Sequence, residues 1–132
     1  MSKTKRVCII DDDKVYTFGV KKIIKSHLPE NDVTTFENGK KALDGIQEMM
    51  ESGAGLPDLI LLDIDMPEMN GWDFLKEFDV IRSKAEKEVE IFVISSRVDT
   101  NTEDLYKIEW DEKVSDFIKK PVQVAALKKI LS

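Results

Sequence analysis

The length, composition and charge of this chain indicate one small globular domain. Its 132 residues, 42% hydrophobic and 35% charged, can bury about two-thirds of the unfolded surface, which allows a substantial core. The net charge of −6 argues against nucleic acid as a partner, because phosphate backbones repel an acidic chain. We also expect a cytoplasmic location and no membrane partner. The reasons are the absence of a signal peptide and of any apolar run near the roughly 18 residues of a membrane span, and a single cysteine, Cys8, which cannot form an internal disulfide.

Short apolar runs along the chain predict five strands. The run Leu59–Leu62 is the clearest, because four apolar residues in a row are typical of a strand buried on both faces of a parallel sheet. It ends at Asp63, and the residues that follow favour a tight loop. In chain order, the predicted strands are Val7–Ile10, Val33–Phe36, Asp58–Asp63, Val89–Ser95 and Val114–Ile118.

Helical periodicity fills the segments between these strands. The first helix has one apolar face that runs from Tyr16 to His27, and Pro29 ends the helix. We expect His27 to be packed or half-buried on that face, whereas Val15 and Phe18 fall outside it and should be exposed. Further helices are predicted after Asn38-Gly39, with Leu43, Ile46 and Met50 facing inward, and over Trp72–Arg82, Thr100–Trp110 and Val122–Leu131.

The alternation of strands and helices predicts the fold. It is typical of an α/β protein with a parallel sheet covered by helices on both faces. Since the first, third and fourth strands are the most apolar, we expect them at the centre of a flavodoxin-like, doubly wound five-stranded sheet with the order 2-1-3-4-5. In that order the C-terminal ends of the first and third strands are neighbours, and the crevice between them is the expected site.

Chemically useful side chains follow four of the predicted strands. Asp11 and Asp12 follow the first strand and Asp63 ends the third, so three carboxylates converge and need a cation. Oxygen ligands with room for water suit a hard octahedral ion, which indicates Mg²⁺. The fourth strand brings the Ser95 hydroxyl and the fifth brings the Lys120 ammonium. A carboxylate nucleophile, a metal, a hydroxyl and a lysine are the parts needed for phosphoryl transfer.

Taken singly, these residues have ordinary structural explanations as turn acids, helix caps, a strand-end hydroxyl or a solvated lysine. Asp13, the third acid of its run, is expected only to cap the next helix or to lie in solvent. We expect Trp72 and Trp110 to pack in the core rather than to stack on a ligand.

Four motifs in order give the chain a family resemblance. V-C-I-I-D-D-D, P-D-L-I-L-L-D-I-D-M-P-E-M-N-G, I-F-V-I-S-S and D-F-I-K-K-P together resemble the receiver domain of two-component response regulators over nearly the whole length. The resemblance implies that Asp63 accepts a phosphoryl group from a sensor histidine kinase or a histidine phosphotransfer protein. It also implies that Asp12 and Asp63 hold Mg²⁺, with Asp11 assisting through water and the Asp65 backbone carbonyl as another ligand.

The same resemblance implies how the domain switches. Lys120 would pair with the acids, and Lys120-Pro121 would be a cis peptide. Ser95 would move toward the phosphoryl group, and Phe117 would swing into the space behind it. The alternative for Phe117 is a purely structural role in the core. A receiver catalyses only its own phosphorylation and dephosphorylation, so we do not expect an enzyme acting on other substrates. The exposed Phe18 beside the site is either a contact for a kinase or ordinary surface.

The position of the chain end gives a further expectation. Ser132 follows directly after the last predicted helix, so we expect residues 1–132 to form a single receiver domain without an output domain, acting as a stand-alone regulator or phosphorelay carrier. A downstream protein effector would bind through region 97–131, in which the segment from Arg97 to Trp110 has few apolar residues and is expected to have two states. The chain would be a monomer or a phosphorylation-dependent dimer.

Two other functions and one special feature remain open from the sequence. The D-I-D of Asp63 and Asp65 also resembles haloacid-dehalogenase-like phosphatases, although there it lies on the first strand. A degenerate, phosphorylation-independent interaction module is the third possibility. Asp65 and Arg97 occupy positions at the mouth of the site that vary in the family. We hypothesise that they pair and set the lifetime of the phosphoryl group, the alternative being two solvated side chains.

Overall fold

The computed structural model describes residues 5–85, 87–95, 110, 112–120 and 122–131. Strands and helices alternate as expected up to residue 95, and the boundaries of the described elements lie within a few residues of the predicted ones. The elements are β1 (Arg6–Ile10), α1 (Lys14–His27), β2 (Asp32–Phe36), α2 (Gly39–Glu51), β3 (Leu59–Asp63), α3 (Gly71–Ala85), β4 (Glu90–Ser95), β5 (Asp116–Lys119) and α5 (Val124–Leu131).

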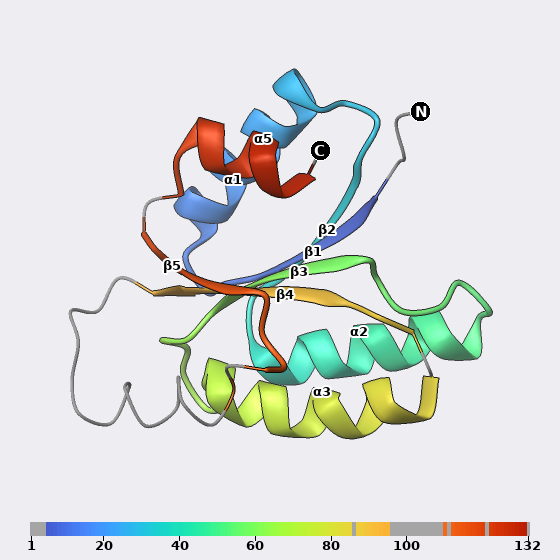
Figure 1. Ribbon diagram of the computed structural model, residues 1–132. Helices are drawn as coiled ribbons and strands as arrows, with labels where there is room; N and C mark the ends of the chain where they lie inside the picture. Colours follow the sequence, from blue (N-terminus) through green and yellow to red (C-terminus); the bar gives the residue numbers. More distant parts are fainter. Residues whose placement is uncertain (1–4, 86, 96–109, 111, 121, 132) are drawn as a thin grey trace.

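The strands form one parallel sheet with the order β2-β1-β3-β4-β5, which confirms the predicted flavodoxin-like topology. Helices α1 and α5 lie on one face of the sheet, and α2 and α3 lie on the other (Figure 1). Every residue of the central strand β3 is buried, because both faces of this strand are covered. The three-layer arrangement thus leaves the ends of the strands as the places where polar side chains can meet.

Side-chain caps fix where the helices begin. The Asp13 carboxylate accepts the Tyr16 N–H at 3.0 Å, which confirms Asp13 as the N-cap of α1. The Asn38 side chain caps α2 in the same way. At α3 the Asn70 side chain accepts the Asp73 N–H at 2.9 Å. Each cap directly follows a strand tip and its loop, so the caps also fix the turns that carry the site.

Some details differ from the expectations. Strand β5 begins at Asp116 rather than at Val114, because the Val114 N–H bonds the Trp110 carbonyl in a turn while its side chain fills the core. His27 is exposed, not packed, since the buried stripe of α1 ends at Ile24, one turn earlier. In α2 the buried apolar residues are Ala42 and Ile46, whereas Leu43 and Met50 pack only partly against the core.

Both tryptophans are buried, which confirms their expected packing role. Apart from Trp110, the helix predicted over Thr100–Trp110 lies outside the described residues. A helix long and apolar enough to cross a membrane is not found in the part of the chain that the structure describes.

Candidate functional site

The register of the sheet brings the predicted site residues to one edge. Ile10 of β1 pairs with Leu62 of β3, so the next residues, Asp11 and Asp63, lie side by side. Asp63 in turn pairs with Ile94 of β4, one residue before Ser95. Ser95 pairs with Lys119 of β5, and its carbonyl accepts the N–H of Lys120 at 2.9 Å. Four residues far apart in the sequence are therefore placed on neighbouring strand ends.

The two acids at the centre of this edge are buried. Asp63 is 3% exposed and Asp11 is 4% exposed. Burial raises the pKa of Asp63 to about 7, helped by the negative charge of Asp11, while Lys120 and the Asp65 backbone oppose the shift. Burial also raises the pKa of Asp11, against the hydrogen bonds that its carboxylate accepts from the Asp13 N–H and from Lys120. The edge thus holds more negative charge than its own partners neutralise.

Lys120 is the cation that faces these acids. Its Nζ lies 2.9 Å from Asp11 Oδ2 and 3.7 Å from Asp63 Oδ1, and its side chain is 16% exposed. Burial disfavours the charged amine, but the hydrogen bond and attraction of Asp11 outweigh burial and raise the pKa of Lys120. The lysine is therefore held as an ammonium, bonded to Asp11 and within ion-pair distance of Asp63.

The acidic group has the composition of a site for a hard cation. Carboxylate oxygens of Asp11, Asp12 and Asp63 all lie within 4.8 Å of one another, and Asp12 is exposed to solvent. Asp63 Oδ1 is buried without a hydrogen-bond partner among the described residues. A buried, unpartnered carboxylate oxygen costs folding free energy unless a cation or donor reaches it. The three acids therefore fit a metal ion with oxygen ligands and water.

The loop after Asp63 is built closely against it. The Gly71 N–H bonds the Ile64 carbonyl at 3.0 Å, which folds the loop back onto the end of β3. A Cβ at Gly71 would lie 2.6 Å from the Asp63 carbonyl oxygen, so only glycine fits there. Asp65 lies in this loop and is partly buried; its side chain is not among the three grouped carboxylates. Its predicted role as a backbone metal ligand stays a prediction.

Of the remaining predicted residues, the structure describes some and not others. Ser95 ends β4 beside the acids and is partly buried. Phe117 is partly buried and packs against the core, with its ring centroid 6.3 Å from that of Trp72. Arg97 and Pro121 lie outside the described residues, so the Asp65–Arg97 pair and the cis peptide stay predictions.

One residue in the site was predicted only as part of a helix face. The Lys120 ammonium lies 4.4 Å from the ring centroid of Tyr16, which puts the aromatic ring in cation–π contact with it. The periodicity of α1 gave no sign of this contact, because Tyr16 shares its spacing with core residues. Its position three residues after the acidic run, together with a lysine at a strand end, was the signal available in the sequence.

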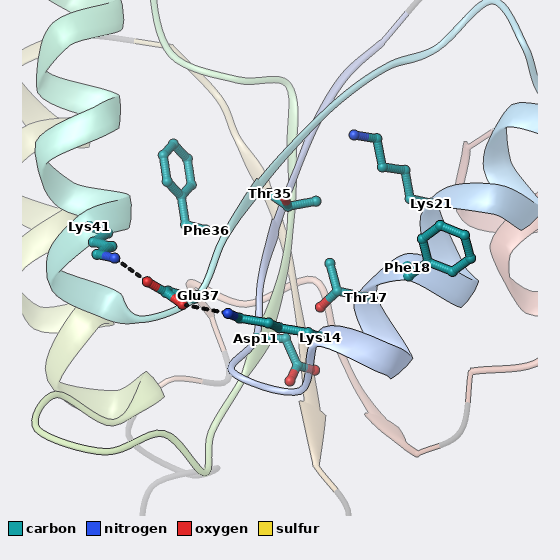
Figure 2. Close-up of a pocket in the computed structure, with 9 residues that line it drawn as sticks. All are labelled: Asp11, Lys14, Thr17, Phe18, Lys21, Thr35, Phe36, Glu37 and Lys41. Carbon is teal, nitrogen blue, oxygen red and sulfur yellow. Dashed lines mark hydrogen bonds and ion pairs between the residues drawn. The ribbon is translucent and has the colours of Figure 1, made fainter.

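A pocket of about 450 Å³ lies beside the site between α1 and β2 (Figure 2). Phe18 and Lys21 of α1 line one side and Phe36 lines the other. Glu37 forms ion pairs with Lys14 of α1 and with Lys41 of α2 (Figure 2). Val15 and Phe18 are 83% and 67% exposed, as predicted, so α1 presents apolar and basic side chains together next to Asp11.

Comparisons with known proteins agree with this geometry. The family model of the response regulator receiver domain matches residues 7–132. The transcriptional regulatory protein HptR of Staphylococcus aureus is 31% identical over 127 residues, which are 96% of this chain and 44% of HptR. The sensor histidine kinase CheAY of Helicobacter pylori is 33% identical over 99 residues, 75% of this chain and 12% of that protein. The chain thus spans less than half the length of both relatives.

Solved structures show the same fold. A two component response regulator from Cytophaga hutchinsonii matches with a TM-score of 0.82 and 25% identity, covering 97% of this chain and 95% of that one. The chemotaxis protein CheY4 of Vibrio cholerae matches with a TM-score of 0.74 and 21% identity, covering 98% and 97%. Receiver domains are signalling modules, not classical enzymes. From its sheet order and the family match over residues 7–132, the chain belongs to the response regulator receiver domain family of two-component signalling.

Proposed function

We propose that this receiver accepts a phosphoryl group on Asp63 from a sensor histidine kinase or a histidine phosphotransfer protein. The observation that carries the proposal is the buried Asp63 Oδ1, which has no hydrogen-bond partner among the described residues and lies 3.7 Å from the Lys120 ammonium. An Asp63 oxygen would attack the phosphorus, and the bond from phosphorus to the donor's imidazole nitrogen would break.

Mg²⁺ is the cation that we propose for the acidic group. Asp11, Asp12 and Asp63 supply only oxygen ligands, and the exposure of Asp12 leaves room for water, both of which suit a hard octahedral ion. The predicted Asp65 backbone carbonyl would complete the protein's share of the ligands. When bound, the ion supplies positive charge that neutralises the carboxylates and the phosphoryl oxygens.

The protein's own groups have separate roles in this proposal. The Lys120 ammonium would neutralise a phosphoryl oxygen, and the Ser95 hydroxyl would donate a hydrogen bond to another. Ser95 ends β4 and Lys120 directly follows β5. A phosphoryl group that attracts both residues would therefore act on the adjoining surface, including Phe117. A downstream protein effector would read this change through region 97–131.

The surface of α1 supports a place for the phosphodonor. Helix α1 carries four lysines and no carboxylate, and its Val15 and Phe18 are exposed. Phe18 lines the same pocket as Asp11 of the acidic group. We propose that a donor docks there with apolar contacts and acidic side chains. A cytoplasmic location and a monomer or phosphorylation-dependent dimer stay predictions.

Incubation with acetyl phosphate and Mg²⁺, followed by intact mass measurement, tests the proposal. The wild type should gain one phosphoryl group, and Asp63→Asn should gain none. Asp44→Asn, at an exposed acid of α2, is the control and should react like the wild type. Equal labelling of Asp63→Asn and the wild type would overturn the assignment of Asp63. Turnover of small phosphate esters would instead favour a phosphatase.

A further inference from the structure

The Lys120 ammonium is held on more than one side. It donates to Asp11 Oδ2 at 2.9 Å, and it lies 4.4 Å from the centroid of the Tyr16 ring. An ammonium has three N–H groups and no acceptor, so it needs several partners when its side chain is largely buried. The face of an aromatic ring is such a partner, because its quadrupole attracts a cation.

Tyr16 is itself fixed by the turn that carries the acids. The Asp13 N–H donates to Asp11 Oδ1 at 2.9 Å, and the Asp13 carboxylate accepts the Tyr16 N–H at 3.0 Å. The Asp11 carboxylate and the Tyr16 ring therefore come from one hydrogen-bonded turn. Both of them contact the same ammonium, which arrives from the opposite side of β3 at the end of β5.

The body of the Tyr16 ring is anchored as well. The side chain is partly buried and packs against the core cluster beneath α1 and α5. The Lys120 backbone is held separately, by its N–H bond to the Ser95 carbonyl at 2.9 Å. Because the Tyr16 ring and the Lys120 backbone are both fixed, the ring limits where the flexible lysine side chain can place its ammonium.

We propose that Tyr16 is a positioning residue that holds the Lys120 ammonium over the acidic group by a cation–π contact. This inference rests on the proposed function, because its consequence is that Lys120 is pre-placed for an oxygen of the phosphoryl group on Asp63. A lysine that is free to leave for solvent would have to be ordered again during each phosphorylation. A cation–π contact in a partly desolvated site corresponds to about 3-fold to 30-fold in affinity.

Beryllofluoride binding in the presence of Mg²⁺ measures this effect, since beryllofluoride is a phosphoryl analogue that binds aspartate. Tyr16→Leu, which keeps an apolar side chain but loses the ring, should weaken the affinity about 10-fold. Tyr16→Phe keeps the ring and should stay within about 2-fold of the wild type. In a Lys120→Gln background, Tyr16→Leu should have no further effect. Equal losses with and without Lys120 would reduce Tyr16 to a packing residue.

Fluorinated phenylalanines at position 16 separate electrostatics from shape. Each added fluorine weakens the ring quadrupole at nearly constant size, so the affinity should fall stepwise from phenylalanine to the trifluoro ring. Thermal unfolding of each variant identifies any that fail to fold. A flat series among folded variants would overturn the proposal.

A structural readout keeps the inference independent of phosphorylation. In the free protein, the ring current of Tyr16 should shift the Lys120 Hε proton resonances upfield. This shift should persist in Tyr16→Phe and vanish in Tyr16→Leu. If the wild type fails to bind beryllofluoride while the shift behaves as expected, the proposed function fails but the ring–ammonium contact stands. Unshifted Lys120 resonances in the wild type would overturn the contact itself.

Discussion

The pair of strands β1 and β3 has a carboxylate next to basic side chains at each end, but the pKa of the carboxylate is lowered at one end and raised at the other. At the N-terminal end, Asp58 accepts the Arg6 N–H at 2.8 Å and pairs with Lys87 at 2.9 Å. Burial works against its charge, but these partners outweigh burial and lower the pKa of Asp58. At the C-terminal end, Asp63 has a lysine at 3.7 Å and a pKa raised to about 7.

The contrast separates a carboxylate used for structure from one available for chemistry. Asp58 has its hydrogen bonds made, and the Arg6 guanidinium beside it ties down the carbonyls of Ala54, Gly55 and Leu56. Asp63 is more deeply buried yet keeps an oxygen without a hydrogen-bond partner among the described residues. An arrangement that costs stability in this way is typical of functional sites.

The largest effect is expected on the phosphorylation rate when Lys120, the cation at the C-terminal ends of the strands, is replaced. Lys120→Gln should slow phosphorylation by acetyl phosphate on the order of 100-fold, because a preorganised charge at the transferring group is lost. Lys119→Gln, at the exposed neighbouring residue, is the control and should change the rate less than about 2-fold. Intact mass spectrometry over time measures the phosphorylation rates. Equal rates for Lys120→Gln and Lys119→Gln would contradict the role of Lys120.

Neutralising Asp63 should stabilise the metal-free protein. Because the pKa of Asp63 is higher in the folded state, the folded state binds more protons between about pH 4 and pH 7, and stability falls as pH rises through that window. Asp63→Asn should therefore raise the free energy of unfolding at pH 8 on the order of 2 kcal/mol.

Urea unfolding in a chelator measures this difference, which should shrink as pH falls toward 4. Asp44→Asn, at an exposed acid, should change the free energy of unfolding by less than about 0.5 kcal/mol. If Asp63→Asn instead lowers the free energy of unfolding, the partners of the native carboxylate offset the cost of burying its charge more fully than its contacts indicate.

Metal affinity should depend on the exposed acid of the group. Asp12→Asn should weaken Mg²⁺ binding about 10-fold, since it replaces a charged oxygen ligand with a neutral one. Asp13→Asn is the matched control, because asparagine also caps helices well and Asp13 is outside the group. Calorimetric titration compares the two, and equal affinities would remove Asp12 from the ligand set.

The smallest effect is expected at the N-terminal end. Asp58→Asn should lower the free energy of unfolding by about 0.5 to 1 kcal/mol, a modest value because the side chain is 37% exposed. Because the pKa of Asp58 is lower in the folded state, its contribution is present above pH 4 and disappears as pH falls further. A higher free energy of unfolding for Asp58→Asn would contradict the contrast between a stabilising carboxylate at Asp58 and a destabilising one at Asp63.

Sequence reasoning reached the topology because the signals were local and periodic. The apolar runs identified the strands, and the rule that ligands meet at the C-terminal ends of parallel strands brought Asp11, Asp63 and Lys120 together. The predictions were wrong where an apolar residue or a helical spacing had a second possible explanation. Val114 is apolar because it fills the core from a turn, and His27 keeps helical spacing beyond the end of the buried stripe.

Contacts between side chains were the part that periodicity does not encode. Tyr16 has the spacing of a core residue, and its contact with Lys120 depends on the turn held by Asp13. The Asp58, Arg6 and Lys87 group was likewise missed, because its members lie on three separate segments at the opposite sheet end. The Asp58 group leaves no motif in the sequence, and the only sequence signal for the Tyr16 contact is its position three residues after the acidic run.

Locating the phosphoryl group on the chain tests the central claim most directly. The protein is treated with acetyl phosphate and Mg²⁺, and borohydride then reduces any aspartyl phosphate to homoserine, which peptide mass spectrometry identifies by position. Homoserine at position 63, and unmodified Asp58 in the same sample, is the predicted result. Homoserine at any other aspartate, with Asp63 intact, would contradict the claim that the C-terminal end of β3 carries the phosphoryl acceptor.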